Sequence, residues 1–320
     1  MRVIGLAVVV AVGLTLASLG SDAQQTGKVW RIGYLTPAVS PRQTLIDALR
    51  ELGYVEGQTA RLELRTAEND LSRLPELAAD LVRAQVDIIV AVSPPAIIAA
   101  KQATATIPVV MRFWGGEGLV DSGVVASFKR PGGNVTGVYM FAAELDAKRL
   151  ELLLQAVPKA RTVGVLNPGV GWSVKHLRQF ADTRRIHLFI SDTPGPNGYG
   201  PVFAAMSKAK IDAVLVPSFP RFYQDHLLII EAAAKQRLPA IYEWGENARA
   251  GGLIAYGPLL AELDRRVAVY IDRIFKGAKP GDLPVEQARR FELIVNLKTA
   301  KSLGLNIPQS LLVRADEIIQ

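Results

Sequence analysis

Short apolar segments typical of buried strands alternate with amphipathic segments of helical spacing along most of the chain beyond residue 30. In the first half, strands are predicted at residues 31–36, 59–65, 87–92, 108–111 and 135–139. Helices are predicted between them at residues 45–52, 71–82, 95–103 and 119–128. This alternation predicts a parallel sheet whose strands are joined by right-handed helical crossovers.

The same alternation restarts in the second half of the chain. A helix at 145–156 precedes predicted strands at residues 162–166, 186–190, 213–216, 240–242, 253–255 and 291–297. Helices are predicted at residues 174–183, 199–208, 222–236 and 259–275, and the chain ends in an apolar tail at 311–319. Two similar α/β halves without a long linker predict two doubly wound parallel-sheet lobes with a ligand cleft between them.

The first 23 residues form the pattern of an export signal. Met1 and Arg2 precede an apolar run over 3–19, and the small residues Ser21 and Ala23 occupy the positions that favour cleavage. We expect cleavage after Ala23 and a periplasmic protein; the alternative is a retained anchor, because 17 apolar residues are just enough to span a bilayer. The chain contains no cysteine, which excludes a lipoprotein anchor and a disulfide framework.

The charge distribution and the absence of certain motifs argue against nucleic-acid binding, catalysis and metal binding. The net charge is +7, but the basic residues are scattered without interleaved aromatics, which argues against nucleic-acid binding. The sequence has no nucleophile elbow, no phosphate-binding Gly-rich loop before Lys-Ser/Thr and no His-Glu-x-x-His pattern. His176, His187 and His226 have no metal-ligand spacing. We therefore expect a protein that is not an enzyme and needs no metal or cofactor.

Ligands of open α/β sheets lie beyond the carboxyl ends of the strands, so the residues after each predicted strand are candidate contacts. Many of them are aromatic, which favours a ligand with an apolar or aromatic body; the alternative is that these rings seal the two lobe cores near the hinge. The candidates are Tyr34, Thr36, Ser93, Pro94, Phe113, Trp114 and Tyr139 in the first half and Asn167, Ser218, Phe219, Glu243 and Trp244 in the second, with Tyr256 as a further aromatic candidate.

Three of these candidates have alternative interpretations. Ser93 precedes prolines at a predicted helix start, where open amides favour a ligand carboxylate, or it is a plain N-cap. Glu243 accepts hydrogen bonds from a ligand ammonium, or it is a surface carboxylate. Asn167 supplies an amide to the ligand, or it forms a turn with Pro168 and Gly169.

Several segments, collinear over nearly all of the chain after residue 24, are typical of one protein family. They are Leu-Gly-Tyr-Val-Glu-Gly-Gln at 52–58, Arg-Pro-Gly-Gly-Asn-Val-Thr-Gly at 130–137, Ala-Gly-Gly-Leu-Ile-Ala-Tyr-Gly at 250–257, and the segments 73–82, 148–153, 275–287, 291–304 and 314–317 with Pro308. On these segments the chain resembles the ABC-transporter substrate-binding proteins that include tryptophan- and tyrosine-binding members.

The resemblance implies a type I periplasmic-binding-protein fold with three crossovers between the lobes. Lobe 1 would comprise residues 24–140 and 258–290, and lobe 2 residues 141–257 and 291–320. It also implies ligand capture by hinge closure for an inner-membrane ABC permease. The chain departs from the family at 113–118, where members commonly carry an Asp-Pro step, and this leaves the ligand open.

The sequence therefore predicts a periplasmic, monomeric substrate-binding component of an ABC importer. Its expected ligand is a small molecule, an amino acid or an aromatic or amphiphilic carboxylate. The alternative is a periplasmic ligand-sensing subunit for a membrane receptor or sensor kinase, because fold alone does not separate the two.

Overall fold

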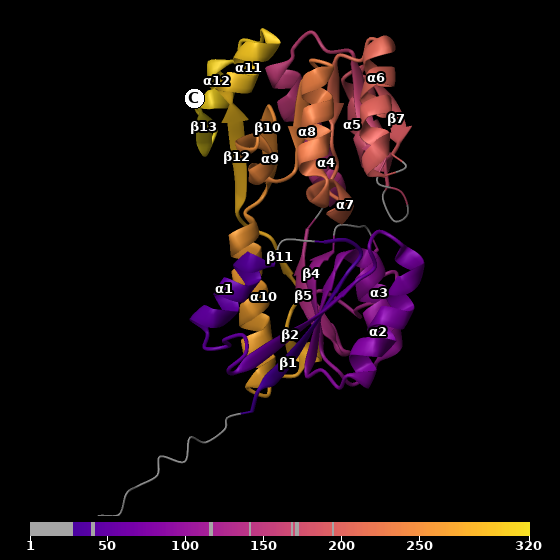
Figure 1. Ribbon diagram of the computed structural model, residues 1–320, viewed down its shortest axis with the longest axis vertical. Helices are drawn as coiled ribbons and strands as arrows, with labels where there is room; N and C mark the ends of the chain where they lie inside the picture. Colours follow the sequence, from indigo (N-terminus) through magenta and orange to yellow (C-terminus); the bar gives the residue numbers. More distant parts are fainter. Residues whose placement is uncertain are drawn as a thin grey trace, which may run out of the picture.

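The computed structural model describes residues 28–39, 42–114, 118–140, 142–167, 169, 173–193 and 195–320. Side chains are described over the same residues except 113, 114, 142 and 143. The predicted export signal lies outside this part of the chain. Figure 1 shows two α/β lobes, one above the other, and the chain passes between them near the middle of the molecule. The predicted fold class is confirmed.

Lobe 1 is built on a six-stranded sheet in the order β11-β5-β4-β3-β1-β2, and all of its pairings are parallel. Its strands are β1 (Trp30–Thr36), β2 (Ala60–Thr66), β3 (Ile88–Val92), β4 (Val109–Trp114), β5 (Val135–Tyr139) and β11 (Glu286–Gln287). Its helices are α1 (Gln43–Glu51), α2 (Leu74–Arg83), α3 (Ser93–Ala103) and α10 (Leu260–Phe275), with short 3-10 turns at Leu71–Arg73 and Pro280–Asp282.

In the described residues, lobe 2 is built on a seven-stranded sheet in the order β13-β12-β10-β9-β8-β6-β7, and the β10–β12 pairing alone is antiparallel. Its strands are β6 (Thr162–Asn167), β7 (His187–Asp192), β8 (Ala213–Leu215), β9 (Ala240–Tyr242), β10 (Ile254–Pro258), β12 (Phe291–Asn296) and β13 (Glu317–Ile319). Its helices are α4 (Ala142–Ala156), α5 (Lys175–Thr183), α6 (Tyr199–Lys208), α7 (Pro220–Gln224), α8 (His226–Lys235), α9 (Gly245–Arg249), α11 (Leu297–Leu303) and α12 (Gln309–Leu312), with a 3-10 turn at Pro196–Gly198.

The chain passes between the lobes after β5, after β10 and after β11. These crossing segments are hydrogen-bonded to one another: Leu259 N donates to Arg290 O at 3.0 Å, and Ala288 N donates to Tyr139 O at 3.1 Å. Because β5, β10 and β11 all end at a crossing, the carboxyl ends of the parallel strands of both sheets face the opposite lobe. This is the edge at which ligands bind in open α/β sheets.

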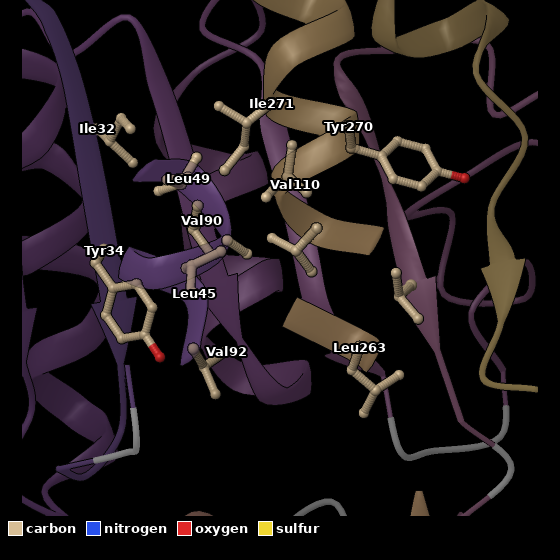
Figure 2. Packing of buried hydrophobic residues seen from close by; sticks show 14 of the residues in the cluster. Ile32, Tyr34, Leu45, Leu49, Val90, Val92, Val110, Leu263, Tyr270 and Ile271 are labelled. Atoms are coloured by element: carbon tan, nitrogen blue, oxygen red, sulfur yellow. The ribbon is translucent and has the colours of Figure 1, made fainter. Parts of the chain in front are cut away.

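Helix α10 follows a strand of lobe 2 but belongs to lobe 1, and its sequence explains why. Its buried residues, which include Leu263, Tyr270 and Ile271, recur at helical spacing and form one apolar stripe. Figure 2 shows this stripe against side chains of α1 and of the sheet, among them Leu45 and Val90. Burial of each such side chain stabilises the fold by about 1.5–3 kcal/mol. The chain therefore returns to lobe 1 after β10, where the apolar stripe of α10 is buried.

The prediction of a helix at 119–128 is wrong. The segment forms turns, because Gly118 and Gly123 adopt left-handed conformations with φ of 82° and 68°, which interrupt helical hydrogen bonding. Leu119, Val124 and Val125 are nevertheless buried in the lobe 1 core. The apolar pattern therefore indicated burial correctly and helix incorrectly.

The single helix predicted at 222–236 is also wrong, because the chain forms α7 and α8 with a break at Asp225. The buried Asp225 carboxylate accepts a hydrogen bond of 2.8 Å from the Tyr199 hydroxyl. Helices α9, α11 and α12 were not predicted. Within the described residues, no helix has the length and apolarity needed to cross a bilayer.

Candidate functional site

A buried charged cluster lies on the lobe 2 side of the interlobe region. It consists of Asp146 and Arg149 from α4 and Glu243, which directly follows β9; these side chains are at most 2% exposed. Arg149 Nη1 donates to Asp146 Oδ1 at 2.5 Å, and Arg149 Nε donates to Tyr256 O at 2.8 Å. The remaining nitrogen, Nη2, lies 3.3 Å from Glu243 Oε1. The cluster thus holds one cation between two carboxylates.

The ion pair between Arg149 and Glu243 does not satisfy the hydrogen-bonding capacity of either group. Neither Glu243 oxygen nor Arg149 Nη2 makes a hydrogen bond of good geometry within the described structure, although all three atoms are buried. Burial raises the pKa of Glu243 to about 7, and the charge of Arg149 and the Ser218 hydroxyl lower it by less. A buried acceptor of this kind fits a donor or a cation from a ligand.

Aromatic side chains surround Glu243 and reach toward lobe 1. Phe219, Tyr223, Glu243 and Trp244 line a narrow pocket of ≈ 10 Å³, and the rings of Tyr223 and Trp244 meet edge to face with centroids 6.2 Å apart. Both rings pack against the apolar cluster of lobe 1. Val39 N also donates to Gln224 Oε1 across the lobes at 3.1 Å. The lobes are therefore in contact, with aromatic side chains between them.

On the lobe 1 side, Ser93 has an unusual environment. It is the first residue of α3 with φ of 73°, while Val92 occupies the N-cap position without a side-chain bond. The Ser93 hydroxyl is buried and makes no hydrogen bond within the described structure. The interpretation of Ser93 as an N-cap is therefore wrong. Left-handed backbone at a non-glycine residue is costly, and such strain is one of the features found at ligand-binding sites.

A fully buried ion pair joins Arg112 at the end of β4 to Asp264 of α10. Arg112 Nε lies 2.6 Å from Asp264 Oδ1 and Nη2 lies 2.8 Å from Oδ2, while Arg112 Nη1 donates to the Tyr34 hydroxyl at 2.7 Å. The hydroxyl of Thr44 also donates to Asp264. The pKa of Tyr223 is raised to about 12, chiefly by burial and also by the negative charges of Glu246 and Asp264, while the positive charge of Arg112 opposes the rise. A lobe 2 ring thus lies within electrostatic range of this lobe 1 pair.

The structure brings together one group of the sequence candidates. Ser218, Phe219, Glu243 and Trp244 lie close together at the carboxyl ends of β8 and β9. Glu243 is buried, so its interpretation as a surface carboxylate is wrong.

The other candidates have different surroundings. Tyr34 is buried beneath the lobe 1 edge, the Thr36 hydroxyl donates to Ala38 O at 2.6 Å, and Tyr139 stacks on Phe128. Pro94 is half-buried in the first turn of α3, and Tyr256 is half-buried against Phe291. The Asn167 amide nitrogen donates to Asp192 Oδ1, and its Oδ1 accepts a hydrogen bond from Gly169 N, as in a turn. The side chains of Phe113 and Trp114 lie outside the described part.

Sequence reasoning missed Asp146, Arg149, Tyr223 and Arg112. Arg149 lies in the segment 148–153 that resembles the family, and a charged side chain on the apolar face of a helix was the available indication. Tyr223 carried no such indication, because its environment depends on the contact between the lobes. Arg112 carried none because its partner Asp264 is 152 residues away in the sequence. No group of His, Asp or Glu side chains in the described structure is arranged to hold a metal ion.

Known proteins similar to this chain share its fold and much of its length. The family model described as ABC transporter substrate binding protein matches residues 38–319. A tyrosine-binding protein of Clostridioides difficile (strain R20291) is 27% identical over 267 residues, which cover 82% of this chain and 76% of the relative.

Solved structures agree with this relationship. An ABC domain from Streptococcus pneumonia in complex with L-Trp is 25% identical, with a TM-score of 0.79, and the match covers 91% of this chain and 100% of that one. The ligand-free, open structure of a substrate-binding protein with adhesive properties from Clostridium difficile has 24% identity and a TM-score of 0.62 over the same shares. The match of the family model over most of the sequence shows that this chain belongs to the ABC transporter substrate-binding protein family.

Proposed function

We propose that the protein captures a small molecule with a carboxylate, an amino group and an apolar or aromatic body between its lobes. The observation that carries this proposal is the pair of unsatisfied polar groups at strand ends of the two facing sheets. The Ser93 hydroxyl and the start of α3 suit a carboxylate, and the Glu243 carboxylate suits an ammonium group. Tyr223 and Trp244 provide apolar surface for the ligand body.

Capture would occur by closure of the lobes about the crossing segments. The contacts of Tyr223 and Trp244 with lobe 1 support a closed arrangement, as does the higher TM-score with the L-Trp complex than with the open, ligand-free relative. In this proposal the aromatic pair makes way for the ligand when the lobes open. A ligand that contacts both lobes stabilises the closed state by its differential affinity.

The physiological role that we propose is delivery of the ligand to an inner-membrane ABC permease by a periplasmic, monomeric protein without catalytic activity. Family membership supports this role. The names of the relatives, which bind tyrosine or were solved with L-Trp, support an aromatic amino acid as the first ligand class to test.

Calorimetric titration of the purified protein with L-tryptophan, indole-3-propionate and tryptamine tests the proposal, because the last two lack the amine and the carboxylate respectively. We expect L-tryptophan to bind best. Ser93→Ala should weaken L-tryptophan and indole-3-propionate but not tryptamine, and Glu243→Gln should weaken L-tryptophan and tryptamine but not indole-3-propionate. Glu231→Gln, an exposed change in the same lobe, is the control. Equal binding of all three compounds by all variants would contradict the site assignment.

A further inference from the structure

A second cavity, separate from the interlobe pocket, lies where the chain leaves lobe 1. It has a volume of ≈ 360 Å³ and is partly open to solvent. One wall is the first half of α10 with the residue before it, and the other is the segment 286–290 together with Val138 of β5. None of its described lining residues also lines the pocket beside Glu243.

Each of the segments that connect the lobes contributes to this cavity. Val138 lies at the end of β5, Leu259 lies between β10 and α10, and Ala288 to Arg290 lie between β11 and β12. The bond from Leu259 N to Arg290 O crosses directly beside it. Because lobe rotation requires backbone changes in these segments, the shape of the cavity depends on the relative position of the lobes.

The charges of the lining favour an anion. Three arginines and two glutamates line the cavity. Arg266 is paired with Glu286, and Glu262 contributes to raising the pKa of Arg266. Arg289 and Arg290 are exposed and form no ion pair within the described structure. With three guanidinium groups and two carboxylates, the cavity carries one excess positive charge, and Arg289 and Arg290 have no carboxylate partner within the described structure.

We infer that this hinge cavity binds a small organic anion, a carboxylate or phosphate group on a short apolar body. The guanidinium groups of Arg289 and Arg290 provide planar donor pairs that match carboxylate and phosphate oxygens. Val138, Leu259 and Leu263 line the rest of the space and suit the carbon body. Such an anion touches all of the crossing segments, so it biases the equilibrium between open and closed lobes. This coupling, unlike the binding itself, rests on the proposed function.

Titration of the purified protein with phenyl phosphate, benzoate and inorganic phosphate tests the inference. We expect saturable binding of phenyl phosphate or benzoate, with a higher affinity than that of inorganic phosphate. Whichever of the two compounds binds more tightly identifies the preferred acid group. The double variant Arg289→Gln/Arg290→Gln should weaken that binding by about tenfold or more. Arg265→Gln removes the same type of charge from the adjacent exposed position of α10, outside the lining, and should leave the affinity unchanged.

Glu262→Gln should raise the affinity for the anion, and a folding defect would not produce a higher affinity. Removal of this carboxylate from the lining should tighten anion binding by about two- to fivefold. Absence of saturable binding, or equal affinity in the arginine double variant and the parent protein, would overturn the inference.

The coupling is tested separately by titration of L-tryptophan with and without saturating phenyl phosphate or benzoate, whichever binds better. A changed L-tryptophan affinity supports coupling, and an unchanged affinity overturns it while the anion site stands. If L-tryptophan does not bind at all, the ligand class proposed for the cleft fails, whereas the direct titration of the anions still decides the hinge site.

Discussion

Arg149 Nη2 lies 3.3 Å from Glu243 Oε1 inside lobe 2, and neither atom completes a hydrogen bond within the described structure. The pair joins α4 to the end of β9, directly below the surface that faces lobe 1. Because Arg149 donates a hydrogen bond to Asp146, it does not supply all the hydrogen-bond donors that the Glu243 carboxylate can accept. This relationship makes Glu243 both a ligand candidate and a source of pH dependence.

We predict that Glu243 lowers the stability of the ligand-free protein as the pH rises. Its pKa is about 7 in the fold against 4.5 ordinarily, chiefly because burial disfavours the charged form. Between these values the folded chain retains a proton that the unfolded chain has released, so the free energy of unfolding falls with rising pH and levels off above about pH 7. Glu243→Gln should remove this slope, an effect of about 2–3 kcal/mol.

Urea unfolding at about pH 5 and about pH 8 measures this effect. The exposed control Glu231→Gln should retain the slope of the parent protein. An identical pH dependence in Glu243→Gln and the parent would show that Glu243 titrates normally.

We expect serine at position 93 to lower the stability of the folded protein. Its φ of 73° is costly for any residue with a Cβ, and its hydroxyl is buried and makes no hydrogen bond to any described residue. We predict that Ser93→Gly is more stable than Ser93→Ala by about 1 kcal/mol, because both remove the hydroxyl but only glycine accepts the backbone conformation readily. Both variants should bind L-tryptophan more weakly than the parent protein. Thermal unfolding and calorimetry provide the two readouts, and a less stable glycine variant would argue against the strained conformation.

Replacement of only one partner of the Arg112–Asp264 ion pair should strongly lower the free energy of unfolding. Asp264→Asn leaves a fully buried guanidinium without its carboxylate and should destabilise the protein by about 3–5 kcal/mol in urea unfolding. Arg112→Met/Asp264→Leu removes both charges and should cost less than the sum of the single changes. The exposed pair of Arg83 with Asp80 serves for comparison, since Arg83→Gln should cost at most about 1 kcal/mol. Additive single changes would contradict direct coupling.

Gly137 allows β5 to approach β4 closely. A Cβ at this position would lie 2.4 Å from Met111 O and 2.6 Å from Met111 N, and the φ is +133°. Gly137→Ala should therefore destabilise the protein by about 3 kcal/mol or more. Gly133→Ala, where a Cβ meets nothing within 4 Å, should change the stability by less than about 0.5 kcal/mol. Equal melting temperatures for the two variants would show that β5 shifts easily.

Much of the fold was predictable because its elements have strong local patterns. The fully buried strand Ile88–Val92 is a continuous apolar run, and α10 has an apolar stripe at helical spacing. The failures occurred where backbone conformation decided the outcome. Gly118 and Gly123 interrupt an apolar pattern that otherwise resembles a helix, and α9 is too short to show periodicity.

The candidate site was predictable only in part. The position of Glu243 after a strand indicated its location, since strand ends of parallel sheets meet at one edge. Its burial and its partner Arg149 were not predictable, because they depend on the packing of α4 over β9. The environment of Tyr223 depends on contact with the other lobe. The residues 113–117, at the site of departure from the family, lie outside the described side chains.

The sequence by itself determined the class of the fold, the order of most elements and the family, because hydrophobic periodicity and collinear segments are local properties of the chain. Only the tertiary structure decided which polar groups are left unsatisfied and which residues share the hinge cavity. Hydrogen-bond satisfaction, desolvation and pKa depend on neighbours that are distant in sequence, as with Arg149 and Glu243, and no local pattern encodes those distances.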